Sequence, residues 1–202
     1  MTIPEKITNV TSDMVLGYFE TLKSCFYVKM GVLYWFQSGD IRKHRELSSV
    51  ASILAKEFND DLAAKVLNSI TSEVVENLKE DAVTALMLSA WTIFEQVIKD
   101  LTVPDYATQP ILLQADYHNG ILGFTQLERK EIDLFYHLRN AIAHYNGAYH
   151  AYRTVDSMYR GQHFKSDGHI GEKIVISPGL AMHIANDLEK YAMKAWSQVG
   201  RS

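Results

Sequence analysis

The sequence predicts an all-α fold, a helical bundle with a small β-hairpin before the C-terminal helix. Apolar residues recur every three or four positions along most of the chain, which is the spacing of an amphipathic helix. The period changes near residues 162–176, where short strands are expected. With 202 residues, of which 47% are hydrophobic and 22% charged, the chain is long enough to bury a full core. We therefore expect a single domain over residues 1–202.

Four helices are expected in the first half of the chain. The first covers residues 12–37, the second 41–58 and a short third 61–70, and residues 1–70 carry no recognisable functional motif. A long fourth helix covers residues 72–101. Its expected inward positions are Val75, Leu78, Val83, Leu86, Ala90, Ile93, Phe94, Val97 and Leu101.

A short helix is expected to open at Pro110, within the connection of residues 105–124. Thr125 and Glu128 then have the spacing of a capping box, in which each side chain binds the other residue's backbone N–H at the start of a helix. We expect this helix to end at Gly147. Its expected inward positions are Leu127, Leu134, Phe135, Leu138, Ala141, Ile142 and Tyr145.

The predicted hairpin pairs residues 162–165 with residues 169–176 around a turn at 166–168. Ser177 then serves as an N-cap, and Pro178 is the first residue of a last helix that runs to about residue 199. The expected inward positions of that helix are Leu180, Ile184, Leu188, Tyr191 and Ala195.

Composition restricts the classes of function. The formal net charge is -4, so no overall positive field recruits nucleic acid, and a polyanion must meet a local patch. The single cysteine, Cys25, excludes an intrachain disulfide and favours a reducing compartment. We find neither a targeting segment nor an apolar run of about 20 residues. A cytoplasmic protein without membrane association is therefore expected.

The candidate catalytic residues are Arg139, Asn140 and His144, which lie within one and a half turns of an otherwise apolar helix. A guanidinium supplies a fixed positive charge and an imidazole moves protons near neutral pH, as metal-free phosphoryl chemistry requires. Asn140 and His144 are four residues apart and face the same way, so the amide is placed to orient the imidazole. Arg139 lies about 140° away around the helix axis, so its side chain reaches the side of His144 only by sweeping around the helix, or if the helix loosens near residues 146–147. Two copies of this helix around a twofold axis would complete the site.

The arrangement of Arg139, a polar residue immediately after it, and His144 after four intervening residues resembles the R-x4-6-H signature of the HEPN superfamily. The segment of residues 89–99, with Trp91 and Glu95, is similar to the helix that packs against the motif helix in that superfamily. The resemblance covers residues 72–199.

This resemblance implies a helical bundle that dimerises through the motif helix and acts as a metal-independent endoribonuclease, without a cofactor, in a toxin or antiviral defence system. Arg139 would stabilise charge on the phosphorane, and His144 would move the proton of the 2′-hydroxyl or the 5′-oxygen. Asn140 would shape this pair, and Glu95 would be a supporting acid. RNA is the implied substrate, and an antitoxin or another defence protein the implied partner.

Several neighbours of the motif are weaker candidates. His137 and Tyr145 are expected to support the site, and Arg129, Lys130, Tyr149 and Arg153 to bind substrate. Between residues 126 and 165 six basic residues stand against four acidic ones, a local charge of +2. In HEPN toxins paired with nucleotidyltransferase antitoxins, a tyrosine that the partner modifies often stands two residues after the histidine. That position here is Asn146, so we do not expect this mode of control.

Other readings of the same residues stay open. Arg139 and His144 also fit a buried polar pair that only stabilises a helix interface, or a non-catalytic module that binds a partner protein, RNA or a nucleotide. A metal-dependent hydrolase would have to use the scattered histidines 137, 150, 163 and 169, but no metal-ligand motif joins them. The aromatic stretch of residues 27–36 is expected in the core or in a dimer interface.

Overall fold

The computed structural model describes residues 11–37, 56, 72–102, 111–113, 115–144, 147–148, 155–166 and 173–199. The predicted helices 41–58 and 61–70 lie outside this set, apart from the helical residue Lys56.

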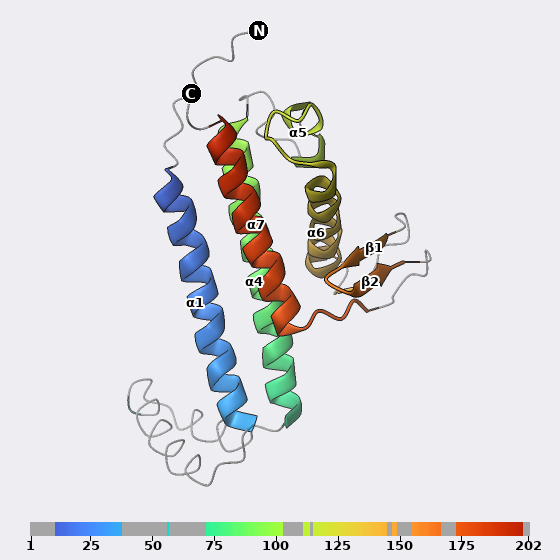
Figure 1. Ribbon diagram of the computed structural model, residues 1–202. Helices are drawn as coiled ribbons and strands as arrows, with labels where there is room; N and C mark the ends of the chain where they lie inside the picture. Colours follow the sequence, from blue (N-terminus) through green and yellow to red (C-terminus); the bar gives the residue numbers. More distant parts are fainter. Residues whose placement is uncertain are drawn as a thin grey trace. The chain divides into compact units, whose positions relative to one another are not determined.

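The described chain is mostly helical (Figure 1). In order along the chain, the elements are α1 (Ser12–Gln37), α4 (Ser72–Leu101), the 3-10 helix η2 (Ile111–Leu113), α5 (Ala115–His118), α6 (Gln126–His144), β1 (Asp156–Tyr159), β2 (Gln162–Lys165) and α7 (Pro178–Val199). The predicted all-α class, with a hairpin before the last helix, is confirmed. The predicted bounds of helices 12–37 and 72–101 are also confirmed.

Two compact units divide the chain, one of Met1–Ser24 with Val83–Ser202 and the other of Cys25–Ala82. In the second unit, Lys79 Nζ donates to Gln37 Oε1 at 2.6 Å and to Glu76 Oε1 at 3.1 Å, and it lies 4.6 Å from the centre of the Tyr34 ring.

Within the aromatic stretch expected in the core or in a dimer interface, Tyr27 and Tyr34 are 60% and 53% exposed and so do not lie in the core of the single chain. Leu78 is exposed as well, against prediction, whereas Val75, one turn before it, is buried.

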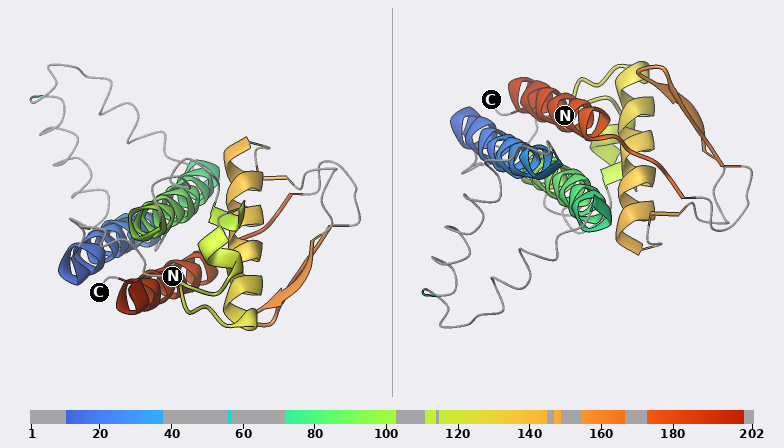
Figure 2. Two further views of the ribbon diagram at one scale, coloured as in Figure 1. Left: turned by 90° about the horizontal axis from the view of Figure 1, so that it is seen from above. Right: turned by 90° about the horizontal axis from the view of Figure 1, so that it is seen from below.

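The core of the first unit contains α4, α6 and α7. Phe94 of α4 and Tyr191 of α7 both contact the ring of Phe124, with centroid distances of 6.3 and 6.1 Å. All five predicted inward positions of α7 are buried, and Ser177 Oγ accepts a hydrogen bond from the backbone N–H of Leu180 at 3.2 Å, as expected of an N-cap. Figure 2 shows the hairpin on one side of α6 and α7 on the other. The motif helix is therefore held from two sides.

The start of α6 is fixed by the predicted capping box. Thr125 Oγ1 accepts from the Glu128 backbone N–H at 3.2 Å, and the Glu128 carboxylate accepts from the Thr125 backbone N–H at 2.7 Å. Lys194 Nζ of α7 lies 2.5 Å from the same carboxylate, and the Tyr191 hydroxyl donates to Glu131. The N-terminal half of α6 is thereby attached to α7.

The charge of Glu128 should make stability depend on pH. Burial raises the pKa of Glu128, but hydrogen bonds from Lys194 and Thr125 outweigh burial and leave the pKa below its usual 4.5. A lowered folded-state pKa means that the carboxylate stabilises the fold above pH 4.5 and that this contribution is lost as the pH falls through the folded pKa. Glu128→Gln should therefore cost about 1 kcal/mol in urea unfolding at pH 7, and this cost should shrink as the pH falls below 4.5 through the folded pKa of Glu128. A cost that stays constant as the pH is lowered would contradict the assignment.

The hairpin differs from the prediction in its pairing. Strand 162–165 is confirmed, but the strand that pairs with it is β1, which precedes it; residues 167–172 of the predicted turn and partner lie outside the described residues. The register pairs Asp156 with Lys165 and Tyr159 with Gln162. Of the predicted partner, the described residues 173–177 contain no strand, although Lys173 forms an isolated bridge with Ala148.

The turn residues explain this pairing. Arg160 and Gly161 have φ values of +48° and +81°, as a type I′ turn requires. Arginine rarely adopts this backbone, but here its guanidinium lies 3.2 Å from Asp187 of α7. The Tyr159 hydroxyl donates to the same carboxylate at 2.6 Å, and burial together with this bond raises the pKa of Tyr159. Contacts of Tyr159 and Arg160 with Asp187 of α7 therefore stabilise the turn, in addition to the glycine at its second position.

Two glycines should respond in opposite ways to alanine. Gly161→Ala places a side chain in the left-handed region, so we expect a loss of about 1–2 kcal/mol in the free energy of unfolding. Gly179 lies in the first turn of α7, and the space that a Cβ would occupy there is open, so Gly179→Ala should gain about 0.4–1 kcal/mol. Urea unfolding of both variants measures the difference, and two changes of the same sign would contradict the turn assignment.

Candidate active site at the C-terminal end of α6

Arg139 leaves α6 from its buried side. It follows Ile132 and Phe135 by seven and four residues, and both of these side chains are fully buried. Phe135 meets the ring of Tyr159 edge-on, with centroids 5.0 Å apart. Asn140 is half-buried and His144 is exposed. The arginine therefore starts on the core side of the helix and the histidine on the solvent side.

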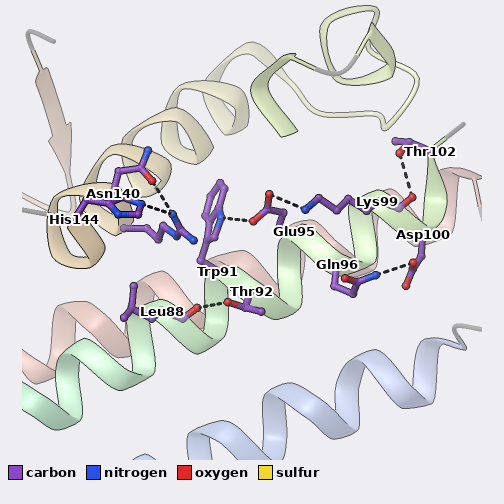
Figure 3. Close-up of polar contacts among 11 residues, drawn as sticks. Leu88, Trp91, Thr92, Glu95, Gln96, Lys99, Asp100, Thr102, Asn140 and His144 are labelled. Atoms are coloured by element: carbon purple, nitrogen blue, oxygen red, sulfur yellow. Dashed lines mark hydrogen bonds and ion pairs between the residues drawn. The ribbon is translucent and has the colours of Figure 1, made fainter. Parts of the chain in front are cut away.

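The guanidinium joins the other two members of the motif. Arg139 Nη1 donates to Asn140 Oδ1 at 2.9 Å and contacts His144 Nε2 at 3.4 Å (Figure 3). The predicted sweep of the arginine around the helix is thus confirmed. Because arginine nitrogens only donate, a hydrogen bond at this contact requires His144 Nε2 as its acceptor. The contact is longer than the usual 2.9–3.0 Å, so it is easily exchanged for a better acceptor.

The Arg139 Nε atom is buried without a hydrogen-bond partner among the described residues. An unsatisfied buried donor costs about 1–3 kcal/mol and calls for an explanation. Arg129 has the same feature, but its Nη1 donates to the backbone carbonyl of His118 at 3.3 Å, which secures the turn before α6. The terminal nitrogen of Arg139 instead points to the two polar side chains of the motif.

The helix end that carries His144 is tied to the segment before α7. Gly147 has a φ of +79°, and its N–H donates to the Ala141 carbonyl at 3.0 Å, in agreement with the predicted cap. The Gly147 carbonyl accepts from the Ile174 N–H at 2.8 Å. These bonds fix the backbone close to the imidazole.

Glu95, predicted as a supporting acid, lies on α4 and is bound within that helix. Its Oε2 accepts from Trp91 Nε1 at 3.1 Å and its Oε1 lies 3.2 Å from Lys99 Nζ. The ring of Trp91 contacts Tyr136 of α6, with centroids 5.6 Å apart. The sequence analysis placed Trp91 in the segment that resembles a helix packed against the motif helix, but it did not single out Tyr136 as the residue that Trp91 contacts.

The remaining candidates lie further from the motif. His137 is half-exposed and stands two turns before His144, about 10 Å along the axis. Lys130 is exposed in the first turns of α6. Contrary to expectation, Leu127 is 67% exposed and so does not pack inward. The other predicted residues near the motif, Tyr145, Asn146, Tyr149, His150, Arg153 and His169, lie outside the described residues.

The described residues include no group of three or more His, Cys, Asp or Glu side chains placed to hold a metal ion. His163 has a single carboxylate partner, Asp156, at 2.6 Å across the exposed face of the hairpin. Within the same described residues, no helix is both long and apolar enough to cross a membrane.

Comparison with known proteins gave no match to a family model, a curated protein or a solved structure.

Proposed function

We propose that this protein is a metal-independent endoribonuclease of the HEPN type that acts as a cytoplasmic homodimer in a toxin or defence system. One observation supports the proposal above the others. A single guanidinium nitrogen, Arg139 Nη1, lies against both the amide oxygen of Asn140 and the imidazole nitrogen of His144. The Nε of the same arginine is buried with no hydrogen-bond partner among the described residues, a stability cost that a catalytic role explains.

The chemistry follows from these groups. As the acceptor of the contact from Arg139 Nη1, His144 Nε2 is the atom that would take a proton from a ribose 2′-hydroxyl. The 2′-oxygen then attacks phosphorus, and the bond from phosphorus to the 5′-oxygen breaks. Arg139 stabilises the negative charge of the phosphorane, for which a guanidinium presents well-oriented donors. The products are a 2′,3′-cyclic phosphate and a 5′-hydroxyl.

A homodimer would supply a second proton-transfer group, which the described part of one chain does not place at the guanidinium. The reaction needs a group that removes a proton and another that delivers one to the leaving oxygen. In the described part of one chain, His144 is the imidazole at the guanidinium, and His137 stands about 10 Å away along the helix. A second copy of α6 around a twofold axis would bring another Arg139 and His144 to the same phosphodiester.

The test is RNA cleavage by the purified full chain in the presence of EDTA. We expect fragments that end in a 2′,3′-cyclic phosphate and begin with a 5′-hydroxyl. Cleavage that EDTA abolishes would replace the proposal with a metal-dependent hydrolase. Absence of cleavage across varied RNAs, together with tight binding of RNA, a nucleotide or a partner protein at Arg139, would replace it with the non-catalytic module.

A further inference from the structure

We infer that Glu95 is a positioning residue that acts through Trp91 to hold the motif side of α6, and is not an acid of the reaction. This inference rests on the proposed nuclease function for its kinetic test. The proposed reaction uses Arg139, Asn140 and His144 and gives no step to the Glu95 carboxylate, so the inference gives that carboxylate a structural role.

Trp91 is a buried aromatic side chain whose indole N–H must find a hydrogen-bond acceptor. Its side chain is 1% exposed, and a buried indole N–H needs an acceptor. The Glu95 carboxylate is that acceptor at 3.1 Å, and Lys99 at 3.2 Å pairs with its other oxygen. Both carboxylate oxygens are thus engaged on α4, and the orientation of the indole is fixed by a charge-assisted hydrogen bond.

The fixed indole reaches the motif through Tyr136. The two rings are tilted by 49° with centroids 5.6 Å apart. Tyr136 precedes Arg139 by three residues and Asn140 by four, so all three lie on neighbouring positions of one helix surface. In Figure 3 the Trp91 indole rises from α4 toward α6, with Glu95 on one side of it and Asn140 and His144 on the other. A rotated indole would leave a void beneath the turn from which the Arg139 side chain departs.

The experiment compares Glu95→Gln, Glu95→Ala and a matched control, Asp100→Asn. Asp100 is a carboxylate of the same helix that binds Gln96 at 2.9 Å. We expect Glu95→Gln, which keeps an acceptor for the indole, to retain RNA cleavage within about 3-fold. Glu95→Ala should lower kcat by about 10-fold or more without moving either limb of the pH–rate profile, and Asp100→Asn should change neither quantity.

A double-mutant cycle tests whether Glu95 acts on the motif through Trp91. Trp91→Phe removes the indole N–H and keeps an aromatic ring, so its loss of kcat and that of Glu95→Ala should not add in the double variant. Additive losses would overturn the route through Trp91. A Glu95→Gln variant as inactive as Glu95→Ala, with the acidic or basic limb of the profile lost, would make Glu95 a proton-transfer group. A fully active Glu95→Ala variant would overturn any role.

One measurement does not depend on cleavage. NMR signals of the Arg139 Nε–H and the His144 ring should shift in Glu95→Ala and stay in place in Glu95→Gln and Asp100→Asn. If the wild-type chain cuts no RNA, the nuclease proposal fails while these signals still decide the positioning role. Unchanged Arg139 and His144 signals in Glu95→Ala would overturn it.

Discussion

His144→Ala is expected to lower the rate of RNA cleavage by about 10²–10⁴-fold, the usual worth of a positioned proton-transfer group. His144 is exposed, so the variant should unfold at the wild-type urea concentration. The measurement is kcat with RNA in excess over the dimer. His163→Ala is the matched control, because His163 is also exposed but binds Asp156 on the hairpin. Retention of full activity by His144→Ala, or an equal loss in the control, would reject the site.

Variants of Arg139 distinguish the contribution of its positive charge to RNA cleavage from the contribution of its planar set of donors. Arg139→Lys keeps the positive charge but cannot reproduce the planar set of donors that contacts Asn140 and His144 together. We therefore expect a loss of about 10²–10³-fold, close to that of Arg139→Ala. Because Nε is buried without a hydrogen-bond partner in the part of the chain that the structure describes, Arg139→Ala should cost little stability or even raise it. Strong destabilisation by Arg139→Ala with cleavage intact would instead support a structural polar pair.

The helices could be predicted from the sequence where local chemistry decides them. The capping box of Thr125 and Glu128 and the Ser177–Pro178 start of α7 need the side chains of one turn, and both are observed. The pairing of the hairpin strands could not be predicted from the sequence, because the left-handed backbone of Arg160 is stabilised by Asp187, which lies 27 residues away. The serine, aspartate and glycine at 166–168 are a stronger local turn signal than Arg160–Gly161, so local sequence alone did not indicate the turn that Asp187 stabilises through Arg160.

In the candidate site, too, the features set by local helical geometry could be predicted from the sequence and those set by packing between elements could not. Helical geometry predicted that the Arg139 side chain must sweep around α6, because 3.6 residues per turn fixes the angle between it and His144. The role of Glu95 as a supporting acid came from resemblance, and the observed contacts of Glu95 with Trp91 and Lys99 depend on side-chain conformations within α4. The contact of Trp91 with Tyr136 depends on how two helices pack, which periodicity does not specify.

Phe135→Ala is expected to cost about 3–5 kcal/mol in the free energy of unfolding. The ring is fully buried in α6 and meets Tyr159 of the hairpin edge-on at 5.0 Å, so its removal leaves a cavity and also loses an aromatic contact. Urea unfolding followed by circular dichroism measures the change. Leu127→Ala is the control, since that side chain is 67% exposed on the same helix and should shift stability by less than about 0.5 kcal/mol.

The same substitution also tests how the site is supported. Phe135 stands one turn before Arg139 on the buried side of α6, where the hairpin packs. A cavity there should loosen the turn that directs the guanidinium, so cleavage by the folded fraction of Phe135→Ala should fall together with stability. Phe135→Leu, which refills most of the volume, should recover much of both. A Phe135→Ala chain that loses less than about 1 kcal/mol would mean that the hairpin does not pack on α6 in solution, and the support proposed for Arg139 from that side would have to be abandoned.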